Sequence, residues 1–178
     1  MNFNALIRTI PDYPKPGIQF RDITTLLKDA AGFHGAIEAL TQRYRGQKIS
    51  KIVGIEARGF MFAAPLAYAL QLGFVPIRKP GKLPGHTLGH DYDLEYGSDR
   101  IEIHDDAIRK GERILIVDDL LATGGTVHAA ASLVRKMGGE IVECAFLVDL
   151  PDISGRKRLE AAGLSIFALR SEEHTSEL

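Results

Sequence analysis

The segment from Val117 to Thr126 contains the residue types best suited to chemistry. It reads Val-Asp-Asp-Leu-Leu-Ala-Thr-Gly-Gly-Thr and stands between an apolar run and a helical pattern. Its small residues can present backbone N–H groups and two hydroxyls at a helix N-terminus, and its glycines let an anion approach the backbone closely. The segment therefore predicts a cradle for a phosphate monoester, made by Ala122, Thr123, Gly124, Gly125 and Thr126.

Asp118 and Asp119 restrict the kind of phosphate that this cradle can accept. Two adjacent carboxylates would repel a bare phosphate, unless they hydrogen-bond sugar hydroxyls and work with a divalent cation. The pair therefore favours a sugar phosphate accompanied by Mg²⁺. The simpler alternative is that the acids cap the following helix while the glycines make a turn.

Basic residues follow two other predicted strands. Arg58 comes after the strand 49–55, and Arg78, Lys79 and Lys82 lie at and after the end of the strand 74–78. Open α/β sheets bind ligands beyond the carboxyl ends of their strands, so these cations are candidates for holding an anion. The alternative for each is a solvated surface charge.

Histidine and cysteine give no sign of a metal or disulfide framework. His86 and His90 have a metal-binding spacing only on a helix, and Gly85 and Gly89 argue against one, so zinc is not expected. Cys144 is the only cysteine and lies in the apolar run 141–148, which predicts a buried, inert thiol.

The elements that must position these residues alternate between strand and helix. Such alternation predicts an α/β fold, with a mainly parallel sheet covered by helices on both faces. Helices are expected at 30–45, 59–70, 126–137 and 154–162, and strands at 49–55, 74–78, 113–117, 141–148 and 164–169. The segment 79–96 is rich in Gly, Pro, His and Lys and is expected to be a mobile loop over the site. Residues 100–104 alternate like a half-exposed antiparallel strand.

Composition limits the class of protein. A chain of 178 residues with 45% hydrophobic content can bury one sizeable core. With 22 basic and 23 acidic residues, its formal charge of -1 gives no bulk attraction to nucleic acid or to an anionic membrane. We find no membrane span and no signal peptide, so a cytoplasmic protein is expected.

The C-terminal residues stand apart from this pattern. Residues 171–178 lack apolar periodicity, and together with Arg170 they resemble the translated adapter of a sequencing library. We therefore expect a single domain at 1–170, followed by a tail at 171–178 that arose as a cloning or sequencing artefact and is dispensable for activity.

Several motifs together resemble one enzyme family. The segment Val117 to Thr126 resembles the donor-binding signature of the type I phosphoribosyltransferases. Further motifs resemble the members that use adenine, and the likeness extends from about Phe3 to Leu169. They are Tyr-Pro-Lys-Pro-Gly-Ile-Gln-Phe-Arg-Asp-Ile at 13–23, Gly-Ile-Glu-Ala-Arg-Gly-Phe at 54–60, Arg-Lys-Pro-Gly-Lys-Leu-Pro at 78–84 and Leu-Glu-Tyr-Gly at 94–97.

The resemblance implies an activity and a fold. The activity is transfer of ribose 5-phosphate from phosphoribosyl pyrophosphate to adenine, giving AMP and pyrophosphate in purine salvage. The fold would include a small N-terminal hood and a flexible loop over the site. The Mg²⁺ would be carried mainly by the donor diphosphate, and the partner would be a second copy of the chain. The homodimer would pair through the face around Arg58 and the loop before it, with Phe60, Phe62 and Leu66 supplying apolar surface.

The resemblance also assigns roles to residues. The 5-phosphate would bind at 122–126, the ribose hydroxyls at Asp118 and Asp119, and the pyrophosphate at Arg58, Arg78, Lys79 and Lys82. Glu95 would be the general acid/base, because the attacking purine nitrogen must lose a proton. Adenine would contact the backbone of Gln19 and Arg21 and the side chains of Phe20 and Leu120. The alternatives are a surface role for Glu95 and a packed core position for Phe20.

The sequence departs from the family pattern in few places: the segment 86–90 differs among members, and one residue differs at position 57. Ala57 stands where other members have serine, which is neutral if only the backbone binds. A regulator that binds the donor without catalysis would usually carry a DNA-binding domain, for which this sequence leaves no room. A salvage enzyme for hypoxanthine or guanine would share the donor loop, but residues 16–23 and Glu95 resemble the members that use adenine. A receiver or P-loop protein is disfavoured because GxxxxGK[ST] is absent.

Overall fold

The structure is a computed structural model that describes residues 2–94, 97–150 and 153–171. The chain forms two compact units, Met1–Arg43 and Tyr44–Leu178. Glu95 and Tyr96 lie outside the described residues, as does the tail from residue 172 onward.

The first unit contains a short antiparallel hairpin and helices. A 3-10 turn, η1 (Phe3–Leu6), precedes strands β1 (Arg8–Pro11) and β2 (Gln19–Asp22), which are followed by α1 (Thr24–Leu27) and by α2 (Ala30–Tyr44). The expected helix 30–45 is confirmed within one residue. Asp22 joins β2 to α1, because its Oδ1 accepts hydrogen bonds from the Thr24 backbone N–H at 2.9 Å and the Thr24 hydroxyl at 2.7 Å. These bonds, reinforced by Arg8, lower the pKa of Asp22 to about 2.

The second unit is built on a parallel sheet of five strands. Its order is β4-β3-β7-β8-β9, and every neighbouring pair is parallel, as the alternation of elements predicts. The central strands are apolar because both faces of the sheet are covered. The strands are β3 (Lys51–Ile55), β4 (Gly73–Ile77), β7 (Arg113–Leu121), β8 (Glu140–Asp149) and β9 (Ile166–Ser171).

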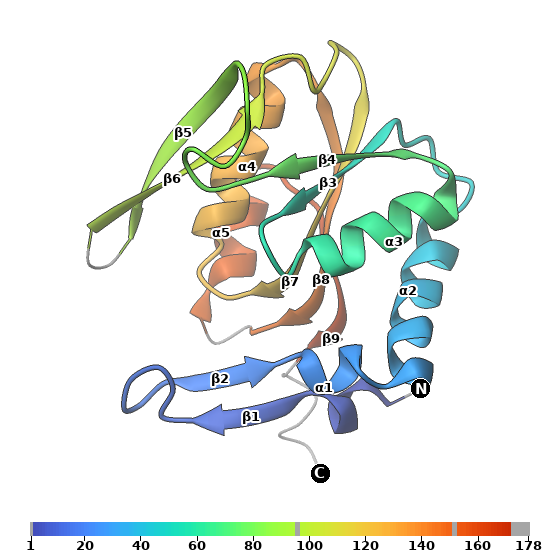
Figure 1. The fold of residues 1–178 in the computed structure, drawn as a ribbon, viewed down its shortest axis with the longest axis vertical. Helices are drawn as coiled ribbons and strands as arrows, with labels where there is room; N and C mark the ends of the chain where they lie inside the picture. The colour runs from blue at the N-terminus through green and yellow to red at the C-terminus, as the bar shows by residue number, and fades with distance from the viewer. Residues whose placement is uncertain (1, 95–96, 151–152, 172–178) are drawn as a thin grey trace. The chain divides into compact units, whose positions relative to one another are not determined.

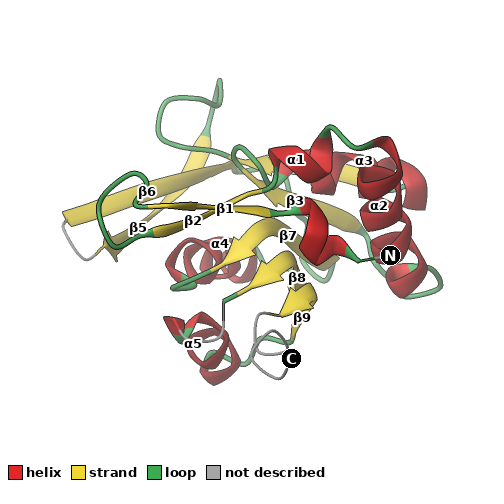
Figure 2. Ribbon diagram, turned by 90° about the horizontal axis from the view of Figure 1, so that it is seen from below, coloured by secondary structure: helices red, strands yellow, loops and turns green. Residues whose placement is uncertain are grey.

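Three helices connect these strands and cover both faces of the sheet. Helix α3 (Phe60–Leu70) leads from β3 outward to β4, whereas α4 (Gly125–Lys136) and α5 (Gly155–Ala161) connect β7, β8 and β9 in the opposite direction. Because such crossovers are right-handed, opposite directions place α3 on one face and α4 and α5 on the other. Figures 1 and 2 show this arrangement.

Strand β7 is longer than the sequence suggested. The expected strand ended at Val117, but pairing with β8 continues through Asp118↔Phe146 and Leu120↔Val148 to Leu121. The strand therefore includes both acids, because backbone hydrogen bonding to a neighbouring strand does not depend on apolar side chains. Asp118 and Asp119 therefore lie near the carboxyl end of β7 and not in the loop that follows it.

A hairpin replaces much of the expected mobile loop. Strand β5 (Thr87–Leu94) pairs antiparallel with β6 (Gly97–His104), from Thr87↔His104 to Leu94↔Gly97. The expectation of loop was therefore wrong for residues 87–94, because cross-strand pairing overrides their polar composition. The expected antiparallel strand 100–104 is confirmed as part of β6. Backbone hydrogen bonds between Arg78 and Glu102, of 3.0 and 2.8 Å, join this hairpin to the end of β4.

The surface of α3 differs from the expectation. Phe62 and Leu66 are 1% and 0% exposed, so they belong to the core and cannot supply an apolar surface. Met61 and Tyr68 are the exposed large apolar side chains of this helix, at 44% and 87%. Among the described residues, no helix is long and apolar enough to span a membrane.

Candidate active site

The candidate site lies where the connections of the sheet change direction. Strands β3 and β7 are neighbours, and the chain leaves their carboxyl ends toward opposite faces. Ligands of open α/β sheets bind in the crevice formed at such a point. A cavity of about 230 Å³ is present there, lined by Ile55, Glu56, Ala57, Arg58, Ile77, Arg78, Lys79, Ile101, Asp118, Asp119, Leu120 and Thr126.

The two predicted acids lie at the base of this cavity. Asp118 Oδ1 accepts a hydrogen bond of 2.9 Å from the backbone N–H of Asp119. Desolvation, followed by the charge of Asp119, raises the pKa of Asp118 well above its usual range. The pair concentrates negative charge where water cannot readily solvate it.

Arg58 supplies the compensating positive charge. Its Nε lies 3.0 Å from Asp119 Oδ2, and the arginine side chain is 43% exposed whereas that of the aspartate is 6% exposed. Asp119 Oδ2 has no hydrogen-bond partner among the described residues. A Cβ at Gly59 would lie 2.5 Å from the Ile55 carbonyl oxygen and 3.0 Å from Asp118 Oδ1, so only glycine fits beside the acid.

The small residues after β7 form a second hollow. It has a volume of about 110 Å³ and includes all five residues predicted to hold phosphate. Gly124 has a φ of +79°, which favours glycine, and it caps α4 at the end where backbone N–H groups are unpaired. The hollow is lined by Asp118, Leu120, Leu121, Ala122, Thr123, Gly124, Gly125, Thr126 and Val127.

Two basic residues after β4 are held by Glu56. Its Oε1 accepts hydrogen bonds from Arg78 Nε at 2.8 Å and from the Lys79 backbone N–H at 3.2 Å. Burial raises the pKa of this carboxyl, but these two donors outweigh burial, and the net pKa lies below the usual value. Glu56 therefore stays charged and fixes the start of the basic segment.

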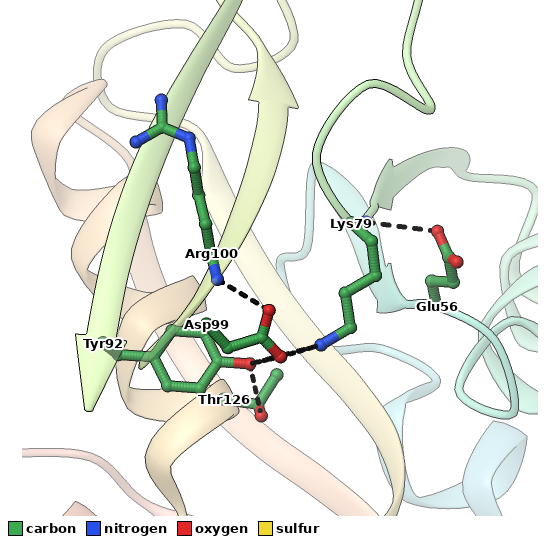
Figure 3. Close-up of polar contacts among 6 residues, drawn as sticks. All are labelled: Glu56, Lys79, Tyr92, Asp99, Arg100 and Thr126. Carbon is green, nitrogen blue, oxygen red and sulfur yellow. Dashed lines mark hydrogen bonds and ion pairs between the residues drawn. The ribbon is translucent and has the colours of Figure 1, made fainter. Parts of the chain in front are cut away.

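The Lys79 side chain enters a network on the hairpin side of the cavity. Its ammonium pairs with Asp99 on β6, and the Tyr92 hydroxyl lies 3.2 Å from Asp99 Oδ2 and 3.1 Å from Thr126 Oγ1. Figure 3 shows these residues converging from β5, β6, α4 and the segment that follows β4. Burial lowers the pKa of Lys79, but the hydrogen bonds and charges of Asp99 and Tyr92 together outweigh burial, and the net pKa lies above the usual value.

The structure brings most of the predicted donor-site residues together. Arg58, Arg78, Lys79, both aspartates and Thr126 line one cavity, and Ala122 to Thr126 line the adjoining hollow. Lys82 does not line either one and lies exposed in the turn that begins at Lys79. Glu95 lies outside the described residues.

The residues predicted for adenine occur on two strands. Gln19, Phe20 and Arg21 are consecutive on β2 in the first unit, and Leu120 lies near the end of β7 in the second. Phe20 is half-buried and meets Tyr13 edge to face, with ring centroids 5.2 Å apart. Leu120 lines both the cavity beside Arg58 and the hollow formed by residues 122–126.

Sequence reasoning did not identify Glu56, Tyr92 or Asp99 as parts of the site. Glu56 could have been found, because it lies two residues before Arg58 at the same strand end. Tyr92 and Asp99 are register partners across the hairpin, and no local pattern in the expected loop reveals that pairing.

His90 and Cys144 both lie on β-strands of the second unit. His90 lies on strand β5 rather than on a helix. Burial raises the pKa of the Cys144 thiol to about 12, which makes it inert. Among the described residues, no group of three or more His, Cys, Asp or Glu side chains is arranged to hold a metal.

Comparisons with known proteins identify the family. The model of the phosphoribosyl transferase domain matches residues 22–166. An adenine phosphoribosyltransferase of Methylobacillus flagellatus is 61% identical over 169 residues, which are 95% of this chain and 96% of that protein.

Two solved structures have the same fold. An adenine phosphoribosyltransferase from Thermoanaerobacter pseudethanolicus has a TM-score of 0.91 at 53% identity, covering 95% of this chain and 97% of that one. One from Saccharomyces cerevisiae, solved with adenine and an imino-altritol bisphosphate, has a TM-score of 0.88 at 38% identity, covering 94% and 96%. The chain belongs to the phosphoribosyl transferase family and, within it, to the adenine phosphoribosyltransferases.

Proposed function

We propose that this chain transfers the 5-phosphoribosyl group of phosphoribosyl pyrophosphate to adenine, forming AMP and releasing pyrophosphate. The observation that carries the proposal is the pair of adjoining hollows at the ends of β3 and β7, one lined by acids and cations and the other by small residues at a helix N-terminus. A sugar with a phosphate at each end needs these two environments side by side. Family membership then supports adenine as the acceptor.

Different residues would bind the 5-phosphate, the ribose and the pyrophosphate of the donor. The backbone N–H groups and hydroxyls of residues 122–126 hold the 5-phosphate, and the carboxylates of Asp118 and Asp119 accept hydrogen bonds from the ribose hydroxyls. Arg58, Arg78, Lys79 and Lys82 attract the pyrophosphate, whose negative charge grows as its bond to C1 breaks. These charges stabilise the leaving group and thereby favour transfer.

The remaining residues bind adenine and accept the proton that it loses. Phe20 and Leu120 offer apolar contact to the ring, and the backbone of Gln19 and Arg21 offers polar groups to its edge. A purine nitrogen forms the new bond to C1 as pyrophosphate leaves, and Glu95 accepts the proton displaced from the base. Atoms and charge balance without any oxidant or reductant.

The acids fit the Mg²⁺ that accompanies the donor. Desolvation and the neighbouring charge of Asp119 raise the pKa of Asp118, so a further positive charge beside the pair would favour its ionised form. A divalent cation bound with the diphosphate would supply that charge to Asp118 and Asp119. When bound, the cation neutralises the pyrophosphate and orients it.

The proposal extends to the whole chain. Residues 1–170 would act as one phosphoribosyltransferase domain, because the relative from Methylobacillus matches this chain over 169 residues. Residues 171–178 would be a dispensable tail, of which Ser171 pairs with Asp149 at the end of β9. The active form would be a cytoplasmic homodimer, with no role for nucleic acid or membrane.

One assay tests the function. Purified full-length chain is mixed with the donor, Mg²⁺ and adenine, guanine or hypoxanthine in turn, and nucleotide formation is followed by absorbance. We expect AMP formation that stops in excess chelator. Equal turnover of guanine or hypoxanthine would contradict adenine as acceptor, and full activity with chelator would contradict the role of Mg²⁺.

A further inference from the structure

Arg158 brings a positive charge close to the phosphate hollow from a helix outside the loop. It lies on α5, which packs beside α4 on the same face of the sheet (Figures 1 and 2). Side chains of a helix point back toward its N-terminus, and the N-terminus of α5 rests on the loop that follows β7. The Arg158 side chain therefore runs toward the residues assigned to the 5-phosphate.

The first residue of α4 shows how close this guanidinium comes. A Cβ built at Gly125 would lie 3.5 Å from Arg158 Nη1 and 3.8 Å from Thr123 Oγ1. The arginine and the threonine hydroxyl therefore face the same point beside Gly125. Gly125 and Thr123 line the hollow of about 110 Å³, and Arg158 lies exposed beside it. Exposed side chains change rotamer rapidly, so Arg158 can contact an anion held there.

The charge of Arg158 has no acidic partner in the part of the chain that the structure describes. Across residues 2–94, 97–150 and 153–171, its side chain forms no ion pair and no hydrogen bond. Arg156 on the same helix differs, because it pairs with Asp149 at 2.8 Å and with Glu160 at 3.5 Å. Arg156 is therefore committed to the fold, whereas the N–H donors of Arg158 are available to a ligand.

Packing of α5 fixes the position from which Arg158 extends. The neighbouring Leu159 is 0% exposed, and its Cγ would lie 3.3 Å from a Cβ built at Gly124. The charge of Arg158 also acts on α4, because it is the largest cause after burial that lowers the pKa of His128, one turn beyond Gly125. A cation therefore stands beside the end of α4 that attracts anions.

We propose that Arg158 is a further binding residue for the 5-phosphate of the donor, and that it adds charge-assisted hydrogen bonds to the cradle formed by residues 122–126. The inference rests on the proposed function, which places the 5-phosphate in that cradle. Hydrogen bonds between a guanidinium and a phosphate are stronger than those from neutral donors. Arg158 thereby favours a phosphorylated ribose over ribose itself.

The 5-phosphate is unchanged by the reaction, and this gives the role of Arg158 a kinetic signature. A contact with it has the same strength in the ground state and in the transition state, so losing the contact raises KM and leaves kcat unchanged. AMP carries the same phosphate and depends on Arg158 to the same degree. Pyrophosphate does not carry it, and its binding is independent of Arg158.

Arg158→Ala tests the proposal in the full-length chain. Calorimetry measures the affinities for ribose 5-phosphate, AMP and Mg²⁺-pyrophosphate separately. We expect the first two to bind about five- to tenfold more weakly, between the effects of an exposed ion pair and a charged hydrogen bond, and pyrophosphate to bind as before. Arg158→Lys keeps the charge and should recover part of the lost affinity. The melting temperature should change little, because the side chain is exposed.

Lys157→Ala is the matched control. It removes the same charge from the adjacent exposed residue of α5, and consecutive residues of a helix point in different directions. All three ligands should bind to it as to the wild type. Equal weakening in Lys157→Ala and Arg158→Ala would be a general charge effect and would contradict the proposal. Equal weakening of pyrophosphate and ribose 5-phosphate in Arg158→Ala would contradict it as well.

Steady-state kinetics separate the inference from the function on which it rests. We expect Arg158→Ala to raise KM for the donor by the same factor as the loss of ribose 5-phosphate affinity, at unchanged kcat. If the wild-type chain forms AMP and Arg158→Ala binds ribose 5-phosphate and AMP equally well, the inference alone is overturned. If the wild-type chain binds neither ribose 5-phosphate nor pyrophosphate and forms no AMP, the proposed function and the inference both fail.

Discussion

Asp118 shows how a binding residue can lower the stability of the protein that contains it. Its side chain is desolvated beside the charge of Asp119, which raises its pKa in the folded state. A raised carboxyl pKa means that the folded chain binds a proton more strongly than the unfolded chain does. Stability is therefore highest below the unfolded pKa and falls as pH rises through the folded pKa.

Asp118→Asn should accordingly stabilise the unliganded chain at neutral pH. We expect the melting temperature to rise by roughly 2 °C or more, since 1 kcal/mol corresponds to about 2–4 °C in a domain of this size. The variant should also lose stability less steeply as pH rises above 4, while its affinity for the donor falls. Calorimetric melts across pH measure both effects.

The control for this variant is Asp106→Asn, because Asp106 is an exposed carboxylate of the same unit. It should leave the melting temperature and donor affinity close to those of the wild type. A lower melting temperature in Asp118→Asn would show that the charged carboxyl stabilises the fold, contrary to this argument.

Substitution of Glu95 should lower the rate of the chemical step more than it lowers the affinity for the donor. Glu95→Gln keeps the size of the side chain but removes the charge and the ability to take a proton. General acid/base groups contribute on the order of 10² to 10⁴ in rate, so kcat should fall by about that range while donor affinity changes little. Single-turnover rates and donor binding measure the two quantities separately.

Asp93→Asn is the matched control for Glu95, since Asp93 is an exposed acid two residues earlier on β5. It should retain nearly full activity. Transfer at the wild-type rate in Glu95→Gln would leave Glu95 with a loop-shaping role and assign the proton to water or to the departing pyrophosphate.

Local chemistry explains which residues could be predicted. The phosphate loop is continuous in sequence, so its small residues and acids can be interpreted without knowing the fold. Arg58 could be assigned to the site because it follows the carboxyl end of a predicted strand. Tyr92 and Asp99 could not, because they meet only through the register of β5 and β6, which depends on pairing between distant residues.

At the scale of elements, the start of α5 supports the phosphate loop. A Cβ built at Gly155 would overlap the backbone carbonyl oxygen of Ala122 and come within 3.0 Å of a Leu121 side-chain carbon. The same helix approaches Gly124, whose own Cβ would lie 3.2 Å from the Gly155 carbonyl oxygen. The loop can keep its shape only if both positions lack side chains.

Gly155→Ala should therefore damage both stability and donor binding. Overpacking typically costs about 1–3 kcal/mol, and here the atoms that must move belong to the loop that holds the 5-phosphate. We expect a lower melting temperature and a weaker affinity for ribose 5-phosphate, measured by calorimetry. Gly73→Ala is the control, because its nearest neighbour would lie 3.8 Å away, and it should bind normally.

The parallel elements were predictable and the hairpins less so. Strands β3, β7 and β8 are buried on both faces, which makes them apolar runs that stand out in the sequence. In contrast, β1 and β2 have four residues each, and β5 is largely polar. Their strand character comes from backbone pairing with a partner, and composition alone does not reveal that.

At the scale of the whole molecule, charge must act locally. The net charge is only -1, yet Arg58, Arg78 and Lys79 line the cavity beside two aspartates. Capture of a polyanion therefore depends on the arrangement of these groups and the cation that accompanies the donor, because the molecule as a whole offers no attraction. The same balance leaves little net repulsion to oppose the association of two copies.

The predicted homodimer can now be tested at a specific surface. Met61 and Tyr68 expose apolar area on α3, the helix that follows Arg58, and buried aromatic side chains often dominate the energy of an interface. We expect light scattering to give twice the 19.5 kDa mass of one chain, and Tyr68→Arg to shift the protein toward monomer. Tyr13→Arg, at a tyrosine that is 53% exposed in the first unit, should leave the mass unchanged. A monomeric wild-type chain would refute the dimer, and a dimeric Tyr68→Arg would show that another surface forms it.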